Sequence, residues 1–186
     1  MDCIGFKIYM EPVLEPVTAS DMKEYLRIPS TDTGHDALLG TLISAARIHV
    51  ERVTGRIFCS STYDIQYRFL DTELKIPVTP VQSVTSVVYK ISNATYTLPA
   101  NQYELRSYKT FPVIVPAWDV SWPAVDEDSV IIRVLAGVAA SPYDKIGMTL
   151  IKAIVADMYV HPESQSEISL TDNKQIERLF NSFVTR

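Results

Sequence analysis

The chain has 186 residues, of which 47% are hydrophobic and 21% are charged, and this composition is typical of a folded globular protein. Its length favours one domain, or one domain with a sizeable insertion. The formal net charge of −5 argues against general binding to nucleic acid, because such binding depends on lysine and arginine neutralising phosphates.

The N-terminal part of the chain predicts an arm followed by a short helix. Residues 1–14 are mainly apolar and are interrupted by glycine and proline, which indicates a strand-like arm or tail. Thr18 and Asp21 have the spacing of a capping box, so a helix is expected to begin there. Pro29 cannot continue this helix, which is therefore short.

The strongest helical periodicity in the N-terminal half runs over residues 36–54 and stops at Gly55. Arg47 and Glu51 lie on the side opposite to an apolar stripe that other elements are expected to cover. Ile48 projects away from this stripe and is predicted to be either an isolated exposed residue or a contact to another subunit. The stripe consists of Leu38, Leu39, Leu42, Ile43, Ala46, Val50 and Val53.

Residues 61–137 have the pattern of strands. Residues 63–69 alternate with period two, and residues 84–91 and 130–135 are rich in β-branched and aromatic side chains. Prolines recur between these runs and forbid a continuous helix. We expect a mainly antiparallel sheet of roughly five to seven strands.

A helical pattern returns after the strands. Ser141 and Pro142 suit the N-cap and first position of a helix whose apolar side chains cover more than half of its circumference. The chain is thus predicted to be α+β, with an N-terminal arm at 1–14 and a small core of about four helices from 15–60 and 138–170. The mainly antiparallel β-sheet subdomain at 61–137 is inserted in this core, and a last helix at 171–186 follows.

The last helix has two interpretations that the residues alone leave open. It packs onto its own core, or it offers a narrow apolar stripe to a groove on a partner. The stripe is formed by Ile176, Leu179, Phe180 and Phe183.

Residue types that carry catalysis are sparse. The chain has no GxSxG, Walker or GxGxxG motif, and His35, His49 and His161 lack metal-binding spacing. Cys3 and Cys59 form no metal-ligand or disulfide pattern, which favours folding in a reducing cytoplasm. We expect no enzyme activity, no cofactor and no metal. A small hydrolase that uses His49 or His35 is the minor alternative.

Acidic and aromatic residues of the strand region admit further interpretations. Three consecutive acids at 126–128 are more often a solvated loop than a metal site. Trp118 and Trp122 are expected to plug the space under a long loop. Tyrosines on the strands are commonly half-buried, yet they keep a carbohydrate- or receptor-binding module as an alternative function. Those considered are Tyr89, Tyr96, Tyr103 and Tyr108.

Short motifs occur in a fixed order from Glu15 to the C-terminus, and none is specific alone. They are Glu15-Pro16-Val17-Thr18, Leu26-Arg27, Asp36-Ala37-Leu38, Ala45-Ala46-Arg47, Lys75-Ile76-Pro77, Pro80-Val81-Gln82-Ser83-Val84, Trp122-Pro123 and Ala136-Gly137. In order and spacing they resemble the head-tail connector (adaptor) proteins of long-tailed bacteriophages that carry a β-rich insertion in a small helical core. The chain departs from that pattern at Val138, Gly147, Asp157 and His161.

This resemblance implies a non-enzymatic virion protein at the head-tail interface, folded in the host cytoplasm and assembled into a ring that is usually dodecameric. The expected partners are the portal protein, neighbouring copies of the chain, and a stopper or tail-completion protein. Double-stranded DNA would pass through the ring without sequence recognition, and no membrane is involved, since no apolar run approaches the roughly 20 residues that span one. The resemblance favours the last helix as the portal contact.

Overall fold

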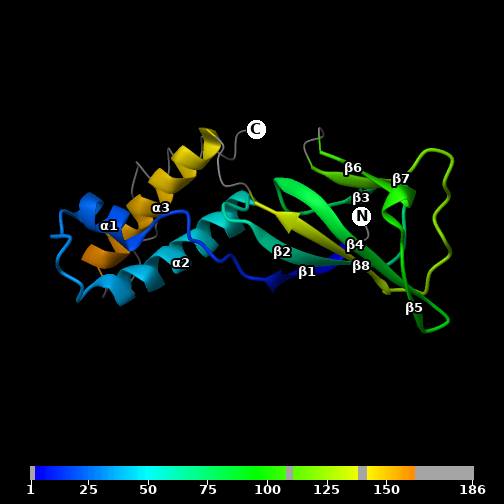
Figure 1. Cartoon of the computed structure of the whole chain (residues 1–186), viewed down its shortest axis with the longest axis horizontal. Coiled ribbons are helices and arrows are strands. Elements are labelled where there is room, and N and C mark those ends of the chain that lie inside the picture. Colours follow the sequence, from blue (N-terminus) through cyan, green and yellow to red (C-terminus); the bar gives the residue numbers. More distant parts are fainter. Residues whose placement is uncertain (1–2, 108–110, 138–141, 162–186) are drawn as a thin grey trace. The chain divides into compact units, whose positions relative to one another are not determined.

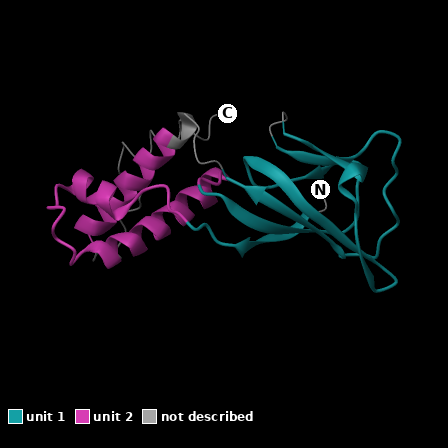
Figure 2. Ribbon diagram, in the orientation of Figure 1, with its two compact units in different colours: residues 1–13, 59–138 teal, residues 14–58, 139–186 magenta. Residues whose placement is uncertain are grey.

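The computed structural model describes residues 3–107, 111–137 and 142–161, which form three α-helices and eight β-strands (Figure 1). The chain divides into two compact units, each built from two separate stretches of sequence (Figure 2). The sheet unit comprises residues 1–13 and 59–138, and the helical unit comprises residues 14–58 and 139–186. The predicted α+β class is confirmed. Three of the about four predicted helices are present, and the one predicted at 171–186 lies outside the described residues.

Helix α1 (Ala19–Leu26) begins at the predicted capping box. The Asp21 backbone N–H donates to the Thr18 hydroxyl at 3.1 Å, and the Thr18 backbone N–H donates to the Asp21 carboxylate at 2.9 Å. The hydrogen bonds from the Thr18 side chain and backbone lower the pKa of Asp21. Arg27, in the left-handed conformation at φ 58°, ends the helix. The sequence pattern of the cap is therefore confirmed.

Helices α2 (Asp36–Thr54) and α3 (Pro142–Val160) pack against each other, and α1 contacts both. The bounds of α2 are those predicted, with Gly55 ending the helix at φ 67°. No helix in the described part of the chain is long and apolar enough to cross a membrane. The core of the helical unit is formed by Val17, Met22, Leu39, Ile43, Ala46, Val50, Phe58, Leu150, Ile151, Ile154 and Val155.

The buried face of α2 is rotated from the predicted stripe. Arg47 and Glu51, expected opposite to that stripe, are buried, whereas Leu38 and Val53, expected within it, are each 50% exposed. The reason is an ion-pair network, because the Arg47 guanidinium donates to Glu15 at 2.7 Å and to Glu51 at 2.8 Å. Charged groups that satisfy one another in this way can occupy a core-facing position that hydropathy alone assigns to solvent.

Helix α3 contains a glycine that the packing of the core requires. A Cβ atom at Gly147 would overlap the aromatic ring of Phe58. The absence of a side chain lets this ring lie directly against the helix backbone. Glycine destabilises the interior of an isolated helix, but at this position it allows the helix to pack closely against Phe58.

The larger sheet of the sheet unit has five antiparallel strands in the order β1-β2-β8-β4-β5 (Figure 1). The central strands β2 (Ser61–Tyr67), β8 (Val130–Ala136) and β4 (Val81–Ile91) fall in the predicted strand runs. At one edge lies β5 (Ala94–Thr97), and at the other lies β1 (Cys3–Met10). The predicted N-terminal arm is thus a strand that completes this sheet.

A second sheet has three short antiparallel strands in the order β3-β7-β6, namely β3 (Leu74–Lys75), β7 (Val113–Pro116) and β6 (Tyr103–Arg106). A 3-10 turn (Ala100–Gln102) precedes β6. Buried side chains alternate along β8, as period two requires, whereas three consecutive residues of β7 are buried. The buried set includes Tyr63, Ile65, Tyr67, Leu74, Ile76, Val87, Ile114, Val130, Ile132 and Val134.

Candidate interaction surfaces

Strand β1 exposes an unusual amount of apolar surface for a strand in a sheet. One of its edges pairs with β2, and no described strand pairs with the other. A long apolar edge of this kind is open to pairing with another chain, and contiguous exposed apolar patches mark protein contacts. We call this surface the β1 strip. It comprises Ile4, Phe6, Ile8, Tyr9, Met10 and Val13, which are between 46% and 91% exposed.

The strip is tied to the sheet by a polar ladder across three strands. The Arg133 guanidinium of β8 donates to the Asp64 carboxylate of β2 at 2.7 Å and 2.9 Å. The same guanidinium lies 3.3 Å from the centre of the Tyr9 ring on β1, which is a cation–π contact. The hydrogen bonds to Asp64 raise the pKa of Arg133, so the guanidinium stays charged. These contacts hold β1 as an ordered surface.

A hollow of about 260 Å³ lies on the sheet beside this ladder. Gly5 contributes the open space, because a Cβ atom there would meet nothing within 4 Å. An engineered apolar cavity of about 150 Å³ holds benzene, so the hollow has room for an aromatic side chain. We call it the β1 hollow. It is lined by Gly5, Phe6 and Lys7 of β1, Asp64 and Gln66 of β2, and Ile131 of β8.

Trp118 lies at the tip of a tight turn and is 94% exposed. The Val120 N–H donates to the Ala117 carbonyl at 3.1 Å and closes the turn, in which Asp119 adopts φ 62°. The Ala117 N–H donates to the Gln102 carbonyl at 3.0 Å, which fixes one end of the turn. The predicted burial of Trp118 under a loop is therefore wrong, because the turn directs its side chain into solvent.

Trp122 differs from Trp118 in its environment. It is half-buried, and its indole N–H donates to the backbone carbonyl of Asp71 at 2.8 Å. Buried tryptophan commonly satisfies its N–H in this way. The predicted position under a loop therefore agrees with Trp122 and disagrees with Trp118.

The three consecutive acids at 126–128 organise turns. The Asp126 carboxylate accepts the backbone N–H groups of Ser92 and Asn93 at 3.0 Å and 2.8 Å, which fixes the turn between β4 and β5. Arg68 lies 3.6 Å from Glu127 and 3.4 Å from Asp128. No group of three potential metal ligands occurs among the described residues. The Asp126 contacts account for its position without a ligand.

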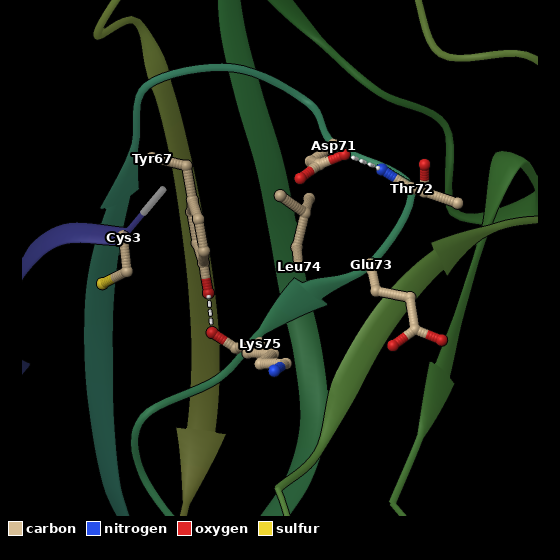
Figure 3. Close-up of a pocket in the computed structure, with 7 residues that line it drawn as sticks. All are labelled: Cys3, Tyr67, Asp71, Thr72, Glu73, Leu74 and Lys75. Atoms are coloured by element: carbon tan, nitrogen blue, oxygen red, sulfur yellow. Dashed lines mark hydrogen bonds between the residues drawn. The ribbon is translucent and has the colours of Figure 1, made fainter. Parts of the chain in front are cut away.

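A pocket of about 290 Å³ lies beside Tyr67 (Figure 3). The Tyr67 hydroxyl points to Lys75 and donates to its backbone carbonyl at 2.8 Å. Burial raises the pKa of Tyr67 and that of the Cys3 thiol, so both remain protonated near neutral pH. Neither is activated as a nucleophile or base, so these two lining residues do not assemble catalytic chemistry. The pocket is lined by Cys3, Tyr67, Asp71, Thr72, Glu73, Leu74 and Lys75.

Each of the histidines, including the two of the hydrolase alternative, lies on or beside a helix. The His35 Nδ1 atom lies 3.1 Å from the Tyr159 hydroxyl, and the two rings meet edge to face. His49 is half-buried on α2. His161 Nδ1 lies 3.6 Å from the Asp157 carboxylate one helical turn earlier. The contact of His35 with Tyr159 fits a side chain that supports helix packing.

The tyrosines of the glycan-binding alternative divide between core and surface. Tyr89 of β4 is buried and stacks on Tyr96 of β5, which is 47% exposed, with ring centres 5.8 Å apart. Tyr103 is half-buried, and burial raises its pKa. Tyr108 lies outside the described residues. One exposed ring of the predicted set therefore remains on this part of the sheet.

The residues predicted as contacts have different outcomes. Ile48 is 51% exposed on α2, which confirms its predicted exposure, while its contact with another subunit stays a prediction. The helix predicted at 171–186, with its four apolar contacts at 176, 179, 180 and 183, lies outside the described residues. Sequence reasoning missed both the β1 strip and the Trp118 turn. The apolar residues at 4, 6, 8 and 10 were the available signal for β1.

The fold matches chains from gene transfer agent (GTA) particles along almost the whole length of both partners. A chain from the neck of an empty GTA particle computed with C6 symmetry superposes with a TM-score of 0.79 and 16% identity, covering 97% of this chain and 95% of that chain. A chain from the virion of a native GTA particle gives a TM-score of 0.76, with the same identity and coverage. A neck chain computed with C12 symmetry gives 0.65 over 95% and 94%. No protein-family model and no curated protein matches the chain.

Proposed function

We propose that the chain is a structural, non-enzymatic head-tail connector that forms a ring in the neck of a phage-like particle. The observation that carries this proposal is the shared fold, at a TM-score of 0.79, with a chain from the neck of a GTA particle. The similar chains span the same length, so the likeness extends over both units. Structures computed with C6 and C12 symmetry support a ring as the form of assembly.

In this proposal one side of the ring binds the portal and the other receives a stopper or tail-completion protein. The portal contact is assigned to the helix predicted at 171–186, because its apolar residues recur at the i, i+3, i+4, i+7 spacing of a helix that lies in a groove. The anchors are Ile176, Leu179, Phe180 and Phe183.

Contacts between copies are assigned to exposed apolar residues. The β1 strip supplies several large side chains on an ordered strand, and Ile48 adds one on α2. Apolar residues buried between subunits would remove this surface from water, which is the main favourable term in association. The strip is therefore the principal candidate for a subunit contact, and Ile48 is a secondary one.

The acidic charge suits a channel for DNA. The chain carries 22 acidic and 17 basic residues, and a protein that neutralises few phosphates does not hold the duplex. Double-stranded DNA would pass through the ring without sequence recognition. The protein would reside in the virion at the head-tail interface after folding in the host cytoplasm.

Electron microscopy of the purified chain mixed with its cognate portal tests the proposal. The expected result is a ring seated on the portal, coaxial with it. A double variant, Phe180→Ala with Phe183→Ala, should weaken portal binding by about 2 kcal/mol per anchor while circular dichroism remains unchanged. Absence of any ring on wild-type portal would refute the proposal. Glycan binding by a small oligomer, or turnover that His49→Ala abolishes, would favour the alternative functions instead.

A further inference from the structure

Among the described residues of the sheet unit, the most exposed large hydrophobic side chain is Trp118, which is 94% exposed at the tip of its turn. Exposed tryptophan is costly to leave in water, and tryptophan is enriched among residues that dominate protein interfaces. The hydrogen bond of Ala117 to Gln102 and the closed turn fix the backbone at this residue before any partner arrives. Such preorganisation lowers the entropy lost on binding. We call the exposed Trp118 side chain on this fixed turn the knob.

The β1 hollow is a matching receptor on the same unit. It has room for one aromatic side chain over Gly5, between strands that supply both apolar and polar lining. Ile131, which is 39% exposed, offers an apolar wall, and the ammonium group of Lys7 can lie against an indole face. An amphipathic ring such as indole suits a lining of mixed character.

Charge makes the two surfaces complementary. The loop 117–129 carries four acids and no lysine or arginine, and Asp119 directly follows the knob. Lys7 lies in the wall of the hollow. Within the described residues neither Asp119 nor Lys7 has an ion-pair partner, so each is available to the other across an interface. The acidic loop also disfavours nucleic acid as the occupant.

We propose that Trp118 of one copy inserts into the β1 hollow of the next copy, with Asp119 facing Lys7. Knob and hollow are different surfaces, so the contact is heterologous and repeats from copy to copy until a ring closes. The inference rests on the proposed function, because it names the residues that join neighbours in the ring. It also gives a role to the Gly5 position of β1, where a side chain would fill the receptor.

Photocrosslinking identifies the occupant directly. Trp118 is replaced by p-benzoylphenylalanine, and equal amounts of isotopically labelled and unlabelled chain are assembled on portal and irradiated. The expected product joins residue 118 of one copy to the hollow of another, seen as labelled–unlabelled hybrid peptides. Crosslinks to portal or another neck protein alone, or no crosslink within complete rings, would overturn the inference and leave the proposed function standing. Absence of rings with wild-type chain would overturn both.

Substitutions on each side test the fit. Trp118→Ala removes the knob, and Gly5→Leu fills the hollow at a position that no described atom crowds. Each should raise the concentration needed for half-complete rings by about 30-fold, as expected for a hot spot. Phe111→Ala is the matched control, since it removes another exposed aromatic residue and should leave this concentration unchanged. Thermal melting verifies that each variant is folded.

A charge exchange tests the orientation of the contact. Lys7→Glu alone should weaken ring formation by about tenfold, because two acids then face each other. Adding Asp119→Lys to the same chain should restore at least part of the loss. Equal weakening by the single and double variants would contradict the pairing of these two residues. Unchanged assembly in folded Trp118→Ala and Gly5→Leu variants would overturn the knob and the hollow themselves.

Discussion

Glu51 allows a sharp test of the helical unit, because its carboxylate joins two parts of the core. It accepts from the Arg47 guanidinium at 2.8 Å and from the backbone N–H of Phe58 at 2.9 Å. The Glu51 side chain is 8% exposed and that of Arg47 is 7% exposed, so water cannot replace these bonds without rearrangement. Replacing Glu51 with alanine therefore removes an acceptor from one buried charge and one buried N–H.

The magnitude follows from what remains after the change. Breaking a buried ion pair typically costs about 3–5 kcal/mol. Arg47 keeps Glu15 at 2.7 Å, so the lower end, about 3 kcal/mol, is expected for Glu51→Ala. For a chain of this size the loss corresponds to a melting temperature lower by about 6–12 °C. Glu51→Gln keeps an acceptor for the N–H and should cost about 1–2 kcal/mol.

The assay is thermal and urea unfolding followed by circular dichroism at a helical wavelength. Glu24→Ala, which removes an exposed carboxylate from α1, is the matched control and should change stability by less than about 0.5 kcal/mol. If Glu51→Ala melts within error of the Glu24→Ala control, the buried network does not stabilise the helical unit and the reasoning fails.

Three further changes test the remaining parts of the fold. Leu39→Ala should lower the free energy of unfolding by about 2–5 kcal/mol, because Leu39 is fully buried, whereas half-exposed Leu38→Ala should cost less than half as much in the same urea titration. Gly137→Ala should destabilise the sheet unit by more than about 2 kcal/mol, since Gly137 has φ 99° and a Cβ atom would overlap the Cys59 backbone; calorimetry measures this. Asp21→Asn should cost a few tenths to about 1 kcal/mol at pH 7. The folded-state pKa of Asp21 is lowered, so its contribution is present above the unfolded pKa and disappears as pH falls through the folded pKa, where the variant should match wild type.

Local signals in the sequence were enough to predict many elements of the fold. The bounds of α2 follow from a period of 3.6 residues and a glycine at its end, and the start of α1 follows from the spacing of Thr18 and Asp21. These features depend on residues a few positions apart. The buried face of α2 could not be predicted in the same way, because it depends on an ion pair between Arg47 and Glu15, which are 32 residues apart in the sequence. Hydropathy does not register such pairing.

The candidate surfaces also depend on long-range contacts that local sequence patterns do not contain. A strand over residues 3–10 was within reach of the sequence pattern, but its pairing with β2 is a long-range contact that no local window contains. Trp118 was expected to plug the space under a long loop. Its exposure depends on how the Ala117 turn is tied to Gln102, which is again a tertiary contact.

The two units have different roles in the proposed assembly, and this difference can be measured. The knob and the hollow both belong to the sheet unit, while the Glu51 network belongs to the helical unit. Glu51→Ala should therefore lower the melting temperature and leave the residue-118 crosslink between copies intact at temperatures where the chain is folded. Trp118→Ala should leave the melting temperature unchanged and raise the concentration needed for half-complete rings, since an exposed side chain contributes little to the stability of its own chain. A variant series in which stability and ring formation fell together would indicate that assembly depends on the folding of both units rather than on the proposed contact.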